Sequence, residues 1–224
     1  MRRAAASSVG TFLGLRRGRG HQRGQRGQGL VEFASLVPVF LLLLLGMLEF
    51  GFAFDQNLTL EYATREGARV GAALANGGGD LGCLAGQSPN AATVDPQILA
   101  AVQRVLVSPG SRVKPALGMQ VKIWKASTAG VPVAGSTNTW SYTGPNTGPT
   151  VDGQQISFTQ GVVQWNACAR SNGGTGGPDS IGVSLTHTYM FQTSLAGILS
   201  FFGGPSAGQL TMSDKTVMAL NPTD

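Results

Sequence analysis

Charged and redox-active residues are scarce in this chain of 224 residues. Only 12% of the residues are charged, and there are two cysteines and two histidines. The low charge and the 42% hydrophobic content exclude an intrinsically disordered protein. Two cysteines without histidines nearby do not supply a zinc site. We therefore expect one modest folded domain with an anchor, without a metal or a cofactor.

Acidic residues are absent from residues 1–27, which carry seven of the 16 lysines and arginines. The rest of the chain holds nine basic and all 11 acidic residues, so the pI near 9.7 reflects this leader alone. A nucleic-acid interface needs basic side chains spread over a folded surface, so we expect no nucleic-acid partner. Arginines ahead of a hydrophobic run instead favour a cytoplasmic N-terminus.

The hydrophobic run covers residues 30–54, and its 25 residues are enough to span a bilayer. It is longer than the core of a secretory signal peptide. The leucines at 41–45 leave no polar face, which disfavours a core helix of a soluble protein. Pro38 is predicted to kink the membrane helix. Glu49 lies near its outer end, within reach of the interface or a neighbouring helix.

The two cysteines, Cys83 and Cys168, both follow this run. With a cytoplasmic N-terminus they lie across the membrane, where disulfides persist. A bond between them would close a loop of about 86 residues and stabilise the folded state by roughly 4–5 kcal/mol in the chain-entropy model. Two free buried thiols are the alternative, and we favour the disulfide.

Helical periodicity continues through residues 55–75 and ends at the glycine cluster of 76–80. Glu61 and Arg65 form a favourable pair one turn apart. We expect an apolar stripe to pack on the protein's own sheet rather than on a foreign partner. The predicted stripe contains Leu58, Tyr62, Ala63, Ala73 and Leu74.

The remaining chain predicts one helix followed by strands. Residues 95–107 have helical spacing, with Asp95 as a cap and Pro96 in the first turn. From residue 119 the period changes to two, and residues 157–168 have room for one or two strands. The clearest strand is 181–191, and 209–219 supplies a last one. The inward face of strand 181–191 would hold Ile181, Val183, Leu185, His187, Tyr189 and Phe191.

No constellation of residues supports catalysis. Residues 204–208 match the pattern G-x-S-x-G, but no histidine follows Ser206 in the chain. His187 on an apolar strand face is typical of a structural histidine. The apolar stretch 195–202 is expected to fill the core or pack on a helix. A membrane-touching or partner-docking edge is the alternative for that stretch.

The N-terminal run resembles a known family. Residues 27–51 read Gly-Gln-Gly-Leu-Val-Glu-Phe-Ala-Ser-Leu-Val-Pro-Val-Phe-Leu-Leu-Leu-Leu-Leu-Gly-Met-Leu-Glu-Phe-Gly, and 63–69 read Ala-Thr-Arg-Glu-Gly-Ala-Arg. Both stretches resemble TadE-like pilus assembly proteins. The resemblance implies a pilin-like subunit, or pseudopilin, of a tight-adherence (Tad/Flp) type IV pilus system. It also implies cleavage by a prepilin peptidase between Gly27 and Gln28.

Glu32 is a carboxylate at the start of the membrane helix, where a charge is costly. Cleavage at Gly27 would create an α-amine close to it in sequence. We hypothesise that this amine on one subunit pairs with Glu32 of the next and sets their register. The alternative is that Glu32 is solvated in the cytoplasmic headgroup layer.

Together these features predict an α+β, pilin-like protein without enzymatic activity. A long N-terminal transmembrane and amphipathic helix would precede a second helix and an antiparallel, β-rich extracytoplasmic head. The expected segments are leader 1–27, membrane helix 28–55, helix continuation 56–76 and head 77–224. Expected partners are the prepilin peptidase, other pilins and pseudopilins, the inner-membrane assembly platform and membrane lipid. An uncleaved, membrane-tethered binding module and an exported enzyme released by signal peptidase are the rival interpretations.

Overall fold

The computed structural model describes residues 25–74, 91–171, 173, 177–204 and 206–220. The chain divides into two compact units, which meet in sequence between Leu43 and Leu44. The first unit contributes only the start of the helix α1, Gln25–Leu74. The second unit contains the rest of α1 and all other described elements, which form an α+β head. The predicted fold class is therefore confirmed.

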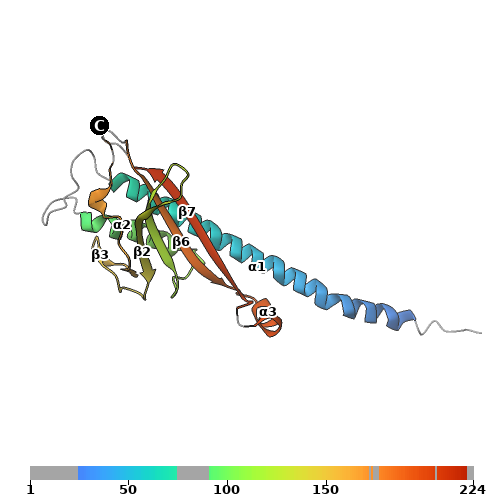
Figure 1. The fold of residues 1–224 in the computed structure, drawn as a ribbon. Coiled ribbons are helices and arrows are strands. Elements are labelled where there is room, and N and C mark those ends of the chain that lie inside the picture. The colour runs from blue at the N-terminus through green and yellow to red at the C-terminus, as the bar shows by residue number, and fades with distance from the viewer. Residues whose placement is uncertain (1–24, 75–90, 172, 174–176, 205, 221–224) are drawn as a thin grey trace, which may run out of the picture. The chain divides into compact units, whose positions relative to one another are not determined.

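The centre of the second unit is a five-stranded antiparallel sheet in the order β5-β2-β1-β6-β7 (Figure 1). The predicted strand 181–191 is β6, which pairs with β7 from Ser180–Ala219 to Met190–Gln209. Residues 157–168 supply one short strand of the sheet and a 3-10 turn. The strands are β1 (Gln120–Ala126), β2 (Pro132–Tyr142), β5 (Phe158–Gln160), β6 (Ser180–Met190) and β7 (Gln209–Ala219).

Smaller elements complete the head. The helix α2, Ala91–Leu106, precedes the sheet in the chain. A two-stranded ribbon of β3 (Thr150–Val151) and β4 (Gln154–Gln155) lies between β2 and β5 in sequence. The 3-10 turn η1, Ala167–Ala169, follows β5. The helix α3, Leu195–Gly203, connects β6 to β7.

Both α1 and α2 pack on one face of the sheet, which makes the hydrophobic core. The alternation predicted for β6 is confirmed, because Ile181, Val183 and Leu185 are fully buried. Val121 and Ile123 of β1 are buried beside them. On α2 the predicted apolar face is also buried, with Ile98, Leu99, Val102 and Leu106. The period-two and period-3.6 patterns thus located the core.

The helix over residues 55–75 packs on the protein's own sheet as predicted, but the predicted apolar stripe is correct only at Ala63 and, where it is partly buried against the core, Leu74. Tyr62 is exposed, whereas a row of mostly small residues is buried. A Cβ added at Gly67 would lie 2.7 Å from Val102 of α2, and one at Gly71 would lie 2.7 Å from Ile181 of β6. Small side chains therefore let α1 approach both neighbours closely. The buried row is Gln56, Leu60, Ala63, Thr64, Gly67, Ala68, Gly71 and Ala72.

Asp95 does not cap a helix, because α2 begins four residues earlier. Its carboxylate is buried and pairs with the Arg170 guanidinium at 2.5 Å. Asn138 Nδ2 donates to the same carboxylate at 2.7 Å and to the carbonyl of Trp165 at 2.7 Å. The guanidinium also lies 4.5 Å from the centre of the Trp165 ring. The carboxylate thus serves a buried network that joins α2, β2 and η1 rather than the helix terminus.

Candidate functional site

The residues predicted to be processed lie at the start of α1. Gly27 and Gln28 are both exposed and lie in the first turn of the helix, which begins at Gln25. Glu32 is exposed one turn later, and its Oε1 accepts a hydrogen bond from Gln28 Nε2 at 3.2 Å. Pro38 lies within α1, which remains one helix through it. Cleavage, the kink and the register role of Glu32 stay predictions.

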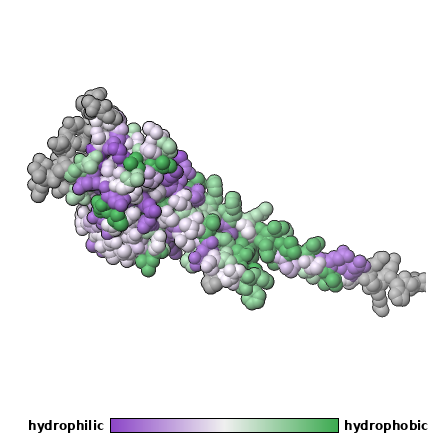
Figure 2. Space-filling model, in the orientation of Figure 1, coloured by the Kyte–Doolittle hydropathy of each residue, from purple (hydrophilic) through white to green (hydrophobic). Residues whose placement is uncertain are grey.

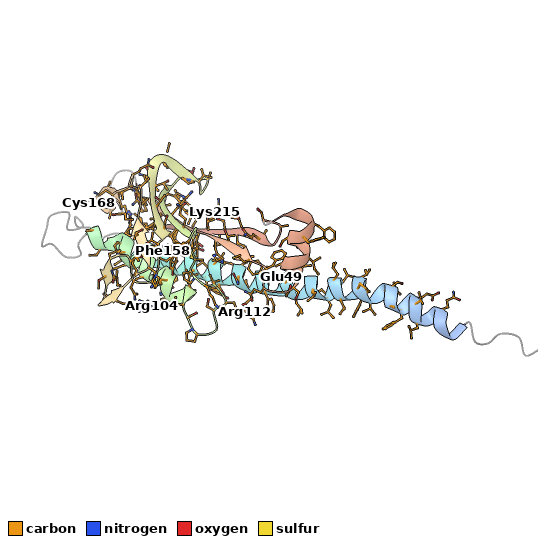
Figure 3. All side chains as sticks on the ribbon, turned by 90° about the horizontal axis from the view of Figure 1, so that it is seen from below. Glu49, Arg104, Arg112, Phe158, Cys168 and Lys215 are labelled. Atoms are coloured by element: carbon orange, nitrogen blue, oxygen red, sulfur yellow. The ribbon has the colours of Figure 1, made fainter. Side chains whose placement is uncertain are left out.

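Glu49 makes the most elaborate contact between α1 and the rest of the head. Its side chain comes from the apolar part of the helix, yet the residue is only 3% exposed. The carboxylate accepts a hydrogen bond from the Tyr189 hydroxyl. It also accepts from the backbone N–H of Gln192 at 2.8 Å and of Thr193 at 2.9 Å. Figure 3 shows Glu49 on α1 beside the ribbon that leads from β6 into α3.

Three donors around one carboxylate explain how a charge is kept out of water here. A buried carboxylate is costly unless hydrogen bonds satisfy it. Tyr189 is itself fully buried, and its ring lies 5.8 Å from that of Phe191. Burial, and then the hydrogen bond to Glu49, raises the pKa of the Tyr189 hydroxyl above its usual value, so it remains a donor. The Glu49 contact therefore fixes the end of β6 to α1.

The segment fixed by Glu49 leads directly into α3. Leu195 is buried, but Ile198, Phe201 and Phe202 are exposed. The expectation that residues 195–202 fill the core is therefore wrong, except for Leu195. The expectation failed because an apolar sequence alone does not say which elements can cover it.

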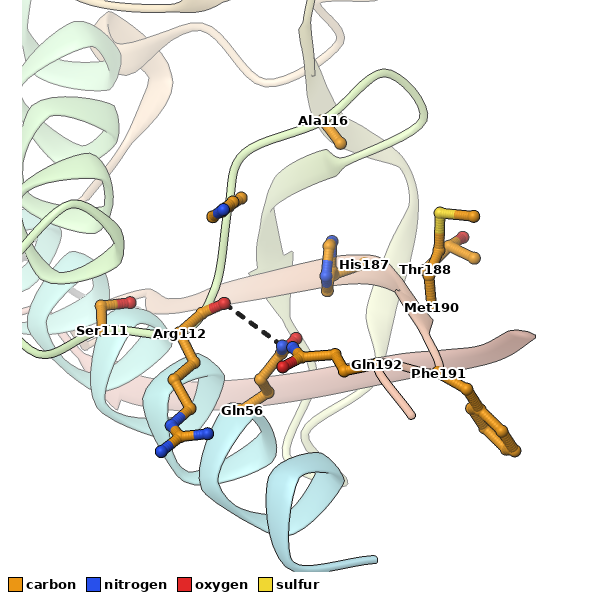
Figure 4. Close-up of a pocket in the computed structure, with 10 residues that line it drawn as sticks. Gln56, Ser111, Arg112, Ala116, His187, Thr188, Met190, Phe191 and Gln192 are labelled. Carbon is orange, nitrogen blue, oxygen red and sulfur yellow. Dashed lines mark hydrogen bonds between the residues drawn. The ribbon is translucent and has the colours of Figure 1, made fainter. Parts of the chain in front are cut away.

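A cavity of about 530 Å³ lies next to this region, between α1, the segment after α2 and the end of β6. Gln56 Nε2 donates to the carbonyl of Arg112 at 3.2 Å (Figure 4). His187 is buried at the cavity, and burial lowers the pKa of its imidazole, which favours the neutral form. The lining also includes Lys114 and Gln192. The structural role predicted for His187 is compatible with this place.

Arg112 marks the polar side of the cavity. Its guanidinium lies 4.6 Å from the centre of the Phe52 ring and 3.6 Å from the carboxylate of Asp55. Both partners belong to α1, one and two turns after Glu49. Charged side chains therefore return to the surface of the helix at Asp55.

The motif at residues 65–69 is split between packing and solvent. Gly67 and Ala68 are buried against the core, whereas Arg65 and Arg69 are exposed. Arg65 pairs with Glu61 as predicted, and Arg69 pairs with Glu66 at 2.7 Å. The small residues thus account for the packing of the motif, and the charged residues cover its outer face.

Only one cysteine of the predicted disulfide lies among the described residues. Cys168 lies in η1, where its backbone N–H donates to the side chain of Asn166 at 3.1 Å. Cys83 lies outside the described residues. The pairing of Cys83 with Cys168 stays a prediction. Among the described residues, no group of three or more His, Cys, Asp or Glu side chains is arranged to hold a metal.

Sequence reasoning placed Glu49 near the outer end of the membrane helix but missed its partners. The available signals were a lone carboxylate in an apolar run and a tyrosine on the inward face of β6. Nothing in the sequence links the two, because they are 140 residues apart. The two backbone donors are invisible to side-chain patterns.

Comparison with known proteins bears on α1 alone. The family model described as TadE-like protein matches residues 27–69. Neither a curated protein nor a solved structure matches the chain. The matched range contains Gly27, Glu32, Pro38, Glu49 and Gly67, and α1 is long and apolar enough to cross a membrane. Over residues 27–69 this chain is therefore similar to TadE-like proteins, which is consistent with a TadE-like pilus assembly protein.

Proposed function

We propose that this protein is a pseudopilin, a minor pilin-like subunit or assembly factor, of a Tad-type pilus. The observation that carries the proposal is the TadE-like match over residues 27–69. That match begins at the glycine of the expected processing site and includes Glu32. The role is structural, without catalysis. Its partners are the prepilin peptidase, other pilins or pseudopilins and the inner-membrane assembly platform.

The proposed placement is a single pass through the inner membrane. The seven arginines of the leader hold the N-terminus in the cytoplasm, and the head lies outside. Packing within the head argues against release by a cut near Asp55. Such a cut would remove Glu49 and leave the Tyr189 hydroxyl and two backbone N–H groups without their acceptor.

Processing is tested by intact mass and N-terminal sequencing of protein from native cells. We expect a chain that starts at Gln28 when the prepilin peptidase is active, and the full leader when it is deleted. Gly27→Ala should block the cut, whereas Gly29→Ala should leave it intact. The two glycines form a matched pair, because a Cβ at either meets no atom within 4 Å.

Each other outcome selects a rival. An intact leader in cells with an active peptidase would refute processing and favour an uncleaved, membrane-tethered binding module. A start near Asp55 would favour an exported protein released by signal peptidase.

The register role of Glu32 has its own test. If the new α-amine pairs with Glu32 of the next subunit, Glu32→Gln should reduce co-purification with pilus components about tenfold or more, because an unpaired amine in lipid is costly. Glu61→Gln is the control, since it neutralises a carboxylate on the same helix beyond the membrane segment. Equal recovery of the two variants would refute the pairing.

A further inference from the structure

The tip of the β6–β7 hairpin carries an exposed apolar face. Ile198, Phe201 and Phe202 recur at the i, i+3 and i+4 positions of α3, so they share one side of the helix. Phe201 is 84% exposed and Phe202 is 81% exposed. Their rings touch edge to face, with centroids 5.2 Å apart. Figure 2 shows hydrophobic surface over α3. Adjacent exposed phenylalanines on one face of a helix are typical of a site that contacts a partner or a membrane.

Hydrogen bonds to α1 fix the backbone that leads into this tip. Glu49 holds the backbone of Gln192 and Thr193, one residue ahead of Ser194 at the start of α3. At the other end, a Cβ added at Gly208 would meet Ala196 at 3.3 Å. The apolar face of α3 is therefore kept near the level of Glu49 on α1.

Counting along α1 places Glu49 at a membrane boundary. About 20 helical residues cross the hydrocarbon core of a bilayer, and residues 30–49 supply that number. Just beyond, Phe50 and Phe54 are exposed and stack with ring centroids 6.5 Å apart. The next charged residue on the helix is Asp55. The boundary between lipid and water is thus expected between Glu49 and Asp55.

The composition of the hairpin fits lipid better than a protein partner. Residues 180–213 contain no Asp, Glu, Lys or Arg. Met190 and Leu210, at the end of the hairpin next to α3, are also exposed. A protein interface normally surrounds its apolar centre with polar and charged residues, and an interfacial membrane helix buries Phe and Leu in the acyl region.

We propose that α3 is a second membrane contact, which inserts Phe201 and Phe202 into the monolayer on the head's side of the bilayer. The contact continues the exposed apolar surface of α1 at Phe50 and Phe54. It rests on α1 spanning a membrane and not on the pilus role, so the two proposals fail separately.

The test uses the full chain reconstituted in vesicles with brominated acyl chains, which quench tryptophan fluorescence by contact. Phe201→Trp reports on α3, and the three native tryptophans are buried at 4% exposure or less. Val131→Trp is the matched control. It lies in the β1–β2 turn, and the sheet register places that turn at the Ser180 end of β6, opposite α3.

The signal of each variant is the emission that its new tryptophan adds to the wild-type spectrum, because the three native tryptophans also emit. We expect brominated lipid to quench this added emission of Phe201→Trp at least threefold relative to non-brominated lipid, with the added emission shifted to shorter wavelength. The Val131→Trp signal should not change. Equal, weak quenching of both variants, with red-shifted emission, would overturn the proposal by placing α3 in water. Blue-shifted emission of Phe201→Trp without quenching would also overturn it, because another protein surface would then cover α3.

A second variant separates insertion from folding. Phe201→Ser with Phe202→Ser should preserve the circular dichroism spectrum, since both side chains are exposed. Ile198→Trp provides a probe that should be shielded from an aqueous quencher when both phenylalanines are present. In the double variant we expect the accessibility of this probe to the quencher to rise about tenfold or more, because each phenylalanine contributes strongly to partitioning. Unchanged protection would contradict insertion through the two phenylalanines.

Discussion

The Glu49 carboxylate accepts the hydrogen bond of the Tyr189 hydroxyl, although the two residues are 140 positions apart. Together with two backbone donors, this contact ties the apolar helix to the end of β6. It is a buried polar contact whose removal leaves several groups without partners. Loss of the carboxylate should therefore lower the stability of the head.

Glu49→Ala should lower the free energy of unfolding by about 2–4 kcal/mol, because one hydroxyl and two N–H groups lose their acceptor. Tyr189→Phe should cost less, about 1–2 kcal/mol, since Glu49 retains the two backbone donors. Denaturation of the full chain in detergent micelles, followed by circular dichroism, measures both. Glu61→Ala is the control, because its pair with Arg65 is exposed. Identical melting of Glu49→Ala and Glu61→Ala would contradict the role assigned to Glu49.

Gly67→Ala should destabilise the head by about 1–2 kcal/mol. The added methyl would lie 2.7 Å from Val102 and 3.4 Å from Val183, so either α1 or the Val102 side chain must move. The cost of overpacking exceeds the gain of about 1 kcal/mol in helix propensity. Gly51→Ala is the matched control on the same helix, because its new Cβ meets nothing within 4 Å. Thermal midpoints of the two variants should therefore move in opposite directions.

Asp95→Ala should destabilise the head by about 3–5 kcal/mol, because it leaves the buried Arg170 guanidinium without its counter-charge. Adding Arg170→Met should recover part of that loss, which a double-mutant cycle in denaturant measures. Lys125→Ala tests the half-buried pair with Asp179 and should cost less, about 1 kcal/mol. A double variant that is no more stable than Asp95→Ala alone would count against this account of the network.

Stability should fall as the pH drops below about 6.5, the usual pKa of histidine. Burial lowers the pKa of His187 in the folded state, so below that pH the unfolded chain binds more protons than the folded chain. Above it, both states are neutral at this residue and the effect vanishes. Melting of the wild-type chain and of His187→Gln between pH 7.5 and 5.5 should show a smaller decline for the variant.

Elements with a single strong period were predictable from the sequence. β6 alternates buried and half-buried residues from Val183 to Tyr189, and α2 repeats large aliphatic residues on one side, so burial follows directly from spacing. The length and composition of α1 likewise predicted a membrane-compatible helix.

The buried face of α1 within the head was not predictable in the same way. Gly67 and Gly71 carry no hydrophobic side chain, so a search for apolar residues overlooks them, yet their lack of a Cβ is what admits Val102 and Ile181. Asp95 was assigned to a cap because its partner Arg170 lies 75 residues away. In each case the deciding contact is made by an element distant in the chain, which local propensity does not encode.

The order of synthesis gives the Glu49 contact a temporal consequence. At about 5–20 residues per second, roughly 7–28 s pass between translation of this glutamate and of its tyrosine partner. During that interval none of the eventual donors to the carboxylate has been made, because all of them lie at or beyond Tyr189. The hairpin can therefore close onto the helix only after most of the chain has been translated.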